Sequence, residues 1–265
     1  KHTYAIGHGC AAEWEGGTGS PVPLVCAVAL PAYEVVSLTP NIYLTDDDGN
    51  YRLDSEGQRQ AVTVSMKELA EGTAEGQAQV ETVLRLYGEW IDARKAEIDD
   101  LPERFRDAAR RHMALAEHAL DRIKTGWQLV GSDRTAQRAF RWANEAMLYQ
   151  QVRSNFPLRE VERGKDDVLR VKGTHPAPVI PQGRGTWRPF QIAFILATLP
   201  ELVDPSRKTR SLVDLIFFPT GGGKTEAYLG ACAVILLARR LRNPEDAGTD
   251  TLMRYTLRLL TAQQF

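Results

Sequence analysis

A glycine-rich turn in the last quarter of the sequence has residue types and spacing that bind phosphate. An apolar run at residues 212–218 predicts a strand, Pro-Thr-Gly-Gly-Gly-Lys-Thr follows at 219–225, and a helical pattern extends from about 223 to 242. Glycines let the backbone approach a phosphate closely, and backbone N–H groups at a helix start form an anion-binding concavity. This strand–turn–helix context predicts a P-loop that binds ATP with Mg²⁺.

The side chains of the turn have separate expected roles. Lys224, the candidate catalytic residue, is expected to reach the β and γ phosphates of ATP, and the Thr225 hydroxyl is expected to ligate Mg²⁺. An ordinary glycine-rich turn before a helix is the alternative, because Phe218 stands where the full pattern has a small residue. The other candidate nucleotide-binding residues of the turn are Thr220, Gly221, Gly222, Gly223 and Glu226.

An Arg-Pro-aromatic-Gln element precedes the turn, at residues 187–191. It is similar to the adenine-reading Q motif of superfamily 2 helicases, which makes Arg188 and Gln191 candidate cofactor-binding residues. A glutamine amide both donates and accepts hydrogen bonds, so Gln191 can pair with the N6 amine and N7 of adenine. The alternative is that Gln191 begins an amphipathic helix over residues 191–199 and faces solvent.

Residues 251–265 predict a short strand followed by a helix, one strand after the candidate P-loop helix. In superfamily 2 helicases this place carries motif Ia, although the Tyr-Thr-Leu-Arg at 255–258 is displaced from the usual spacing. Thr256, Arg258 and Gln263 are candidate DNA contacts, since hydroxyl and guanidinium groups near a helix start suit phosphates. The alternative is that these are ordinary surface positions.

Three further charged groups have structural explanations beside functional ones. Arg134, Arg138 and Arg141 line one side of a predicted helix, as a solvated face or a DNA surface. The acidic residues 46–48 are contiguous rather than alternating, which favours a solvated turn over a calcium loop. The arginines at 239–242 complement the dipole at the end of the predicted helix.

Composition describes an ordinary soluble globular chain, with 43% hydrophobic and 25% charged residues among 265. No apolar run approaches the roughly 18 residues of a membrane span, and no signal-peptide pattern opens the sequence, so a cytoplasmic protein is expected. Three cysteines without CxxC spacing argue against a disulfide framework and a cysteine zinc site. Net charge is −1, yet residues 150–265 hold 17 basic and 11 acidic side chains, which suits phosphates.

The pattern predicts four regions and an α/β fold class. Residues 1–66 predict a mixed β region with strands near 22–30 and 33–38, and residues 67–170 predict a helical region. Proline and glycine are dense in residues 171–186, which predict a linker. Residues 187–265 predict the first part of a truncated RecA-like ATP-binding domain, in which the P-loop follows the first strand of a parallel sheet.

Three amphipathic helices are expected in the helical region. The second begins near Asp100 and Pro102 and ends near Gly131, and Ser132 or Asp133 caps the third. The apolar stripes that predict them are Val80, Val83, Leu84, Tyr87 and Ile91; Phe105, Ala109, Met113, Ala116, Leu120 and Ile123; and Ala136, Phe140, Ala143 and Met147.

With these three motifs in order, the chain resembles superfamily 2 helicases, and within them the large helicase subunits of DISARM, a bacterial anti-phage defence system. The resemblance rests on residues 187–191, 218–230 and 253–265, with 4–10 and 30–35 in addition. It implies an ATP-dependent DNA helicase or translocase in the bacterial cytoplasm, with no membrane and with a partner subunit of the DUF1998-containing (DrmB-like) type.

The sequence departs from that family pattern in two ways. It has no Asp-Glu-x-His/Asp (Walker B) box and no second RecA-like domain, so we expect this stretch to bind nucleotide poorly and not to hydrolyse it. The parent protein is then the enzyme. Two other classes remain open: a P-loop ATPase that is not a helicase, and a non-enzymatic DNA-binding or adaptor module whose nucleotide loop is vestigial.

Overall fold

The computed structural model describes residues 11–15, 22–28, 39–46, 48–154, 156, 159–174, 179–180, 184–217 and 222–254. Its contacts divide the chain into two units, residues 1–38 and 39–265. In the first unit, β1 (Ala11–Glu15) pairs with β2 (Leu24–Val28) as an antiparallel ladder. The strand predicted near 22–30 is thereby confirmed, and the one predicted at 33–38 lies outside the described residues.

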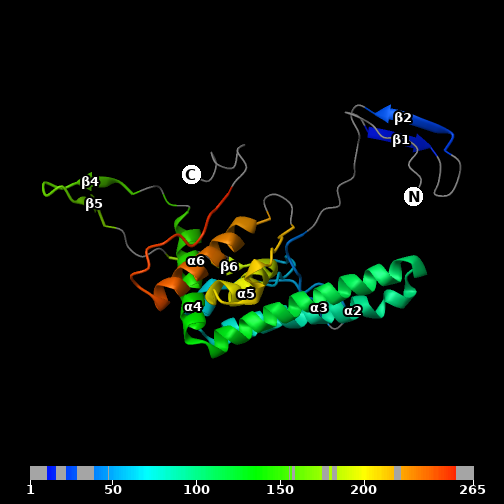
Figure 1. Ribbon diagram of the computed structural model, residues 1–265, viewed down its shortest axis with the longest axis horizontal. Coiled ribbons are helices and arrows are strands. Elements are labelled where there is room, and N and C mark those ends of the chain that lie inside the picture. Colours follow the sequence, from blue (N-terminus) through cyan, green and yellow to red (C-terminus); the bar gives the residue numbers. More distant parts are fainter. Residues whose placement is uncertain are drawn as a thin grey trace. The chain divides into compact units, whose positions relative to one another are not determined.

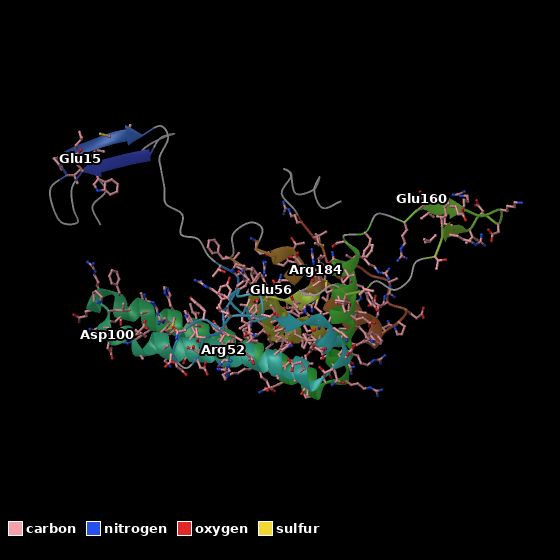
Figure 2. The ribbon with its side chains drawn as sticks, turned by 180° about the vertical axis from the view of Figure 1, so that it is seen from behind. Glu15, Arg52, Glu56, Asp100, Glu160 and Arg184 are labelled. Atoms are coloured by element: carbon pink, nitrogen blue, oxygen red, sulfur yellow. The ribbon has the colours of Figure 1, made fainter. Side chains whose placement is uncertain are left out.

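The second unit begins with a stretch, residues 43–61, that folds back on itself through isolated antiparallel β-bridges. Figure 2 labels Arg52 and Glu56 in this stretch. The acidic run is a turn in this stretch: Asp46 Oδ1 accepts from the backbone N of Asp48 at 3.1 Å and of Asn50 at 2.8 Å. Gly49 closes the turn at φ +82°, a conformation that favours glycine. The predicted turn is confirmed, because the Asp46 carboxylate serves the turn's own backbone.

A helical hairpin follows, made of α2 (Ala74–Ala96) and α3 (Glu103–Ser132), which lie antiparallel in Figure 1. The short α1 (Met66–Glu71) precedes it, and the turn η1 (Ile98–Asp100) joins its helices. The stripe of α3 is buried at Leu120 and Ile123, but Phe105 is 48% exposed. The predicted stripe is therefore not buried at Phe105, which lies in the first turn of α3.

Helix α4 (Arg134–Arg153) confirms the third predicted helix closely. Asp133 caps it by accepting from Ala136 N at 2.7 Å, and all four residues of its predicted stripe are buried. A carboxylate at this position satisfies one of the N–H groups that a helix start leaves unpaired. After α4, in a stretch without a helical stripe, β4 (Val161–Arg163) and β5 (Leu169–Val171) form an exposed antiparallel hairpin.

The core of the second unit joins helices from both sides of the predicted linker. Helix α5 (Pro189–Val203) packs on α3, and α6 (Lys224–Arg242) packs on α4 and α5, as Figure 1 shows. The two-residue strands β3 (Val64–Ser65) and β6 (Thr186–Trp187) pair antiparallel beside them. Among the described residues, no helix is both long enough and apolar enough to cross a bilayer.

The predicted parallel sheet is not found among the described residues, where every strand pair is antiparallel. After the turn η2 (Lys208–Ser211), residues 212–217 form no strand with any described segment. Val213 and Leu215 are 89% and 85% exposed. The predicted strand is therefore wrong over 212–217. An apolar run becomes a strand only when a neighbour accepts its backbone hydrogen bonds, and no described segment lies in that position.

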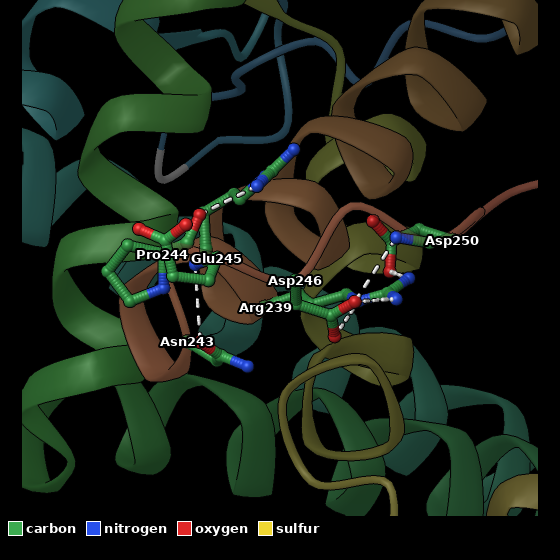
Figure 3. Close-up of polar contacts among 8 residues, drawn as sticks. Arg239, Asn243, Pro244, Glu245, Asp246 and Asp250 are labelled. Carbon is green, nitrogen blue, oxygen red and sulfur yellow. Dashed lines mark hydrogen bonds and ion pairs between the residues drawn. The ribbon is translucent and has the colours of Figure 1, made fainter.

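An ion-pair cluster fastens the chain after α6 back onto the helix (Figure 3). Arg239 donates to Asp246 Oδ2 at 2.5 Å and to Asp250 Oδ1 at 2.6 Å. These arginine bonds hold the pKa of the Asp246 carboxyl at about 2, below its ordinary value. Arg240 donates to the Pro244 carbonyl, so these arginines have specific partners beyond the predicted interaction with the helix dipole.

We expect Asp246→Asn to lower stability at neutral pH and to change nothing in strong acid. The carboxyl's pKa is 3.8 ordinarily and about 2 in the fold, so its stabilisation is complete above pH 4 and is lost between about pH 4 and pH 2. Urea unfolding of parent and variant over this range measures the difference. A difference that stays constant with pH would contradict the ion pair.

Candidate nucleotide-binding site

The described part of the glycine-rich turn is Gly222 and Gly223, which lead directly into α6. Gly223 caps the helix with φ +88° and ψ 27°, the left-handed conformation that other residues adopt only with strain. A Cβ on Gly223 would lie 2.7 Å from Nε2 of Gln191 and 3.3 Å from Nη1 of Arg188. The backbone angle therefore favours glycine here, and a Cβ at this position would displace the end of the Gln191 side chain.

Arg188 and Gln191 hold the turn by its carbonyl groups. Arg188 Nη1 donates to Gly222 O at 2.7 Å, and Gln191 Nε2 donates to Gly223 O at 2.7 Å. Gln191 Oε1 in turn accepts from the backbone N of Arg188 at 2.8 Å. The solvent-facing alternative for Gln191 is wrong, since its side chain is only 4% exposed. The structure thus brings together the two predicted motifs, which stand more than 30 residues apart in sequence.

Trp187 anchors this upstream element in the core. Its indole Nε1 donates to Asn144 Oδ1 at 2.7 Å, and Asn144 Nδ2 donates to Phe140 O at 2.8 Å, so both buried polar groups are satisfied. A Cβ on Gly230 would lie 2.9 Å from the Trp187 ring, which shows how closely α6 approaches it. Sequence reasoning missed Asn144; the available signal was a polar residue within the apolar stripe of its helix.

Glu226 lies in the first turn of α6 and faces the same glycine. Its Oε2 is buried and, in the described part of the chain, has no hydrogen-bond partner. This oxygen stands 3.4 Å from the position of a Cβ on Gly223. A buried acceptor without a donor is unfavourable, so a ligand that brings a donor or a cation to this point would be stabilised.

The other predicted site residues divide into two groups. Lys224 and Thr225 open α6 and are partly buried. The remaining predicted residues, Thr220 and Gly221 of the turn and Thr256, Arg258 and Gln263 of the expected DNA contact, lie outside the described residues. Among the described residues, no group of three or more His, Cys, Asp or Glu side chains is placed to hold a metal ion.

The fold and the site thus define a helical domain in which a buried glutamine and a partly buried arginine hydrogen-bond to a glycine-rich turn at a helix start. Over its whole length, the chain resembles the DISARM protein DrmA of Bacillus paralicheniformis (strain ATCC 9945a / NCIMB 11709 / CD-2), with 32% identity over 274 residues. The match covers 100% of this chain, and the chain spans 22% of the length of that relative. No family model matches the sequence.

Proposed function

We propose that this chain forms the nucleotide-binding front of an ATP-dependent DNA helicase or translocase that acts in bacterial anti-phage defence. The full protein would hydrolyse ATP and use the opening and closing of two RecA-like lobes to move along DNA in the cytoplasm, with a DrmB-like partner. The similarity to DISARM protein DrmA supports the defence role. The observation that best supports nucleotide binding is the pair of hydrogen bonds that Arg188 and Gln191 donate to the Gly222 and Gly223 carbonyls.

These two hydrogen bonds support phosphate binding because they orient the peptide groups of the turn. When a carbonyl is held on one side, the N–H of the same peptide unit points to the other. The two bonds occupy carbonyls of consecutive residues, so the N–H groups of the same two peptide units point away from Arg188 and Gln191. Such N–H groups at a helix start, reinforced by the helix dipole, are suited to a polyanion.

The residues at this turn also fit a magnesium–phosphate group. Lys224 would neutralise the β and γ phosphates, and the Thr225 hydroxyl would ligate Mg²⁺. The unsatisfied Oε2 of Glu226 adds an acceptor for a water of the hydrated cation.

Gln191 retains the hydrogen-bonding capacity that adenine recognition needs. An amide has two acceptor sites on Oε1 and two hydrogens on Nε2, and the structure uses one of each. The remaining pair matches the N6 amine and N7 of adenine. In this role the Gln191 side chain would contact both the adenine base and the glycine-rich turn. The identity of the base would then affect the conformation of the turn.

Lys224→Ala in the full-length protein is expected to weaken ATP–Mg²⁺ binding at least about a hundredfold. Removing the lysine deletes the charge-assisted bond that it would make to the phosphates. Isothermal titration with a non-hydrolysable ATP analogue and Mg²⁺ measures the loss.

The matched control is Lys124→Ala, which removes an exposed lysine from α3. This variant is expected to bind the analogue like the parent. Equal affinity in the Lys224→Ala protein would reject the nucleotide site.

A further inference from the structure

One face of α4 leaves two large aromatic side chains partly exposed. Trp142 is 42% exposed and Tyr149 is 38% exposed, whereas the opposite face of α4 supplies Phe140, Ala143 and Met147 to the core. The two rings are seven residues apart, which places them about two turns, or about 10 Å, apart along the helix axis. A strand lying along α4 would therefore meet the rings in succession.

An arginine accompanies each ring. The Arg138 Cζ lies 4.7 Å from the centroid of Trp142, and the Arg153 Cζ lies 5.5 Å from that of Tyr149. Within the described residues, neither arginine forms an ion pair. Arg141 differs, because it donates to the two carbonyls that end α1 and so serves the fold.

A cavity of about 530 Å³ opens beside these residues, between α1 and α4. Its charged lining is Lys67, Arg138 and Arg141 against Glu71 and Glu145, and Lys67 lies 3.9 Å from Glu71. Arg153, outside the lining, adds a further cation beside Tyr149. The surface therefore combines an excess of positive charge with apolar rings and a hollow large enough for a nucleobase.

We propose that Arg138, Trp142, Tyr149 and Arg153, the α4 stacking face, bind single-stranded nucleic acid. Exposed rings stack on bases of any sequence, and arginines beside the rings meet the phosphates that connect those bases. A duplex keeps its bases stacked internally and presents only phosphates to this surface. The α4 stacking face is thus expected to favour single strands.

This inference deepens the proposed function by giving its DNA substrate a second contact surface, and it rests on DNA being that substrate. It involves none of the residues assigned to ATP. Lys224→Ala and the α4 variants therefore report on separate sites, and failure of one assignment is distinguishable from failure of the other.

The test measures binding of a fluorescein-labelled oligodeoxythymidine to the full-length protein without nucleotide, by fluorescence anisotropy. Trp142→Ala and Tyr149→Ala are each expected to weaken binding about tenfold or more, and Trp142→Phe and Tyr149→Phe to keep it within about threefold. Arg138→Gln and Arg153→Gln are each expected to lower the slope of log affinity against log salt by about one. Trp90→Ala, at a 48% exposed tryptophan of α2, is the matched control and should change nothing.

Three outcomes would overturn the proposal. One is an unchanged oligodeoxythymidine affinity in both alanine variants, while the parent binds the probe. Another is an equal loss for a blunt DNA hairpin, which would indicate phosphate contact without stacking. The third is an equal loss of affinity in the phenylalanine and alanine variants, which would indicate that ring stacking does not contribute to binding.

Discussion

Gly126→Ala is expected to destabilise the second unit by about 3 kcal/mol or more, the upper range for overpacking. A Cβ on Gly126 would lie 1.8 Å from the backbone oxygen of Leu196, where α3 crosses α5. A backbone atom cannot rotate away as a side chain can, so the two helices must separate. The separation would expose Leu196, Leu199 and Ile123, which are buried in the same core. Urea unfolding followed by far-ultraviolet circular dichroism measures the change.

The same helix provides the control for this prediction. A Cβ on Gly131 meets nothing within 4 Å, so Gly131→Ala is expected to be neutral or to stabilise by up to about 1 kcal/mol through helix propensity. The two substitutions are chemically identical and five residues apart. Similar stabilities for both would show that α3 and α5 do not approach as closely as the structure has them.

Gly223→Ala is expected to weaken ATP–Mg²⁺ binding by about tenfold to a hundredfold. The left-handed backbone of Gly223 costs an alanine about 1 to 2 kcal/mol, and the added methyl would push aside the Gln191 amide that holds the Gly223 carbonyl. The turn is then expected to relax, so that its N–H groups lose their common direction. Titration of the full-length protein with a non-hydrolysable ATP analogue measures the affinity.

Gly49→Ala separates backbone strain from damage to the site. Gly49 also has a positive φ, +82°, but a Cβ there meets nothing within 4 Å. Both variants are expected to lose similar stability from the backbone, and only Gly223→Ala is expected to lose nucleotide affinity. If the two variants bind the analogue equally well, the close contact between Gln191 and the turn has no role in binding.

Local signals in the sequence predicted the helices well. Asp133 followed by an apolar stripe predicted the start and the buried face of α4, and the glycine at 223 predicted the start of α6. The turn at residues 45–50 was also predicted from its own residues. Each of these features depends on hydrogen bonds within about one helical turn, so neighbouring residue types are sufficient to specify it.

Predictions that required distant partners were less complete. The run at 212–217 has the composition of a strand, but the described residues provide no neighbouring strand for it. Phe105 continues a helical stripe, yet it is exposed in the first turn of α3. Asn144 interrupts an apolar stripe, but the sequence does not indicate its partner, the Trp187 indole 2.7 Å away.

The sequence by itself therefore determined where the helices run, that a glycine-rich turn opens one of them, and which residue types surround it. The tertiary structure alone decided that Gln191 is buried against Gly223, that Arg188 holds Gly222, and that Trp142 and Tyr149 stay on the surface. The physical reason is the sequence separation over which each kind of interaction acts. Caps and stripes act between residues a few positions apart, whereas burial and cross-element hydrogen bonds depend on which distant segments the packed core brings into contact.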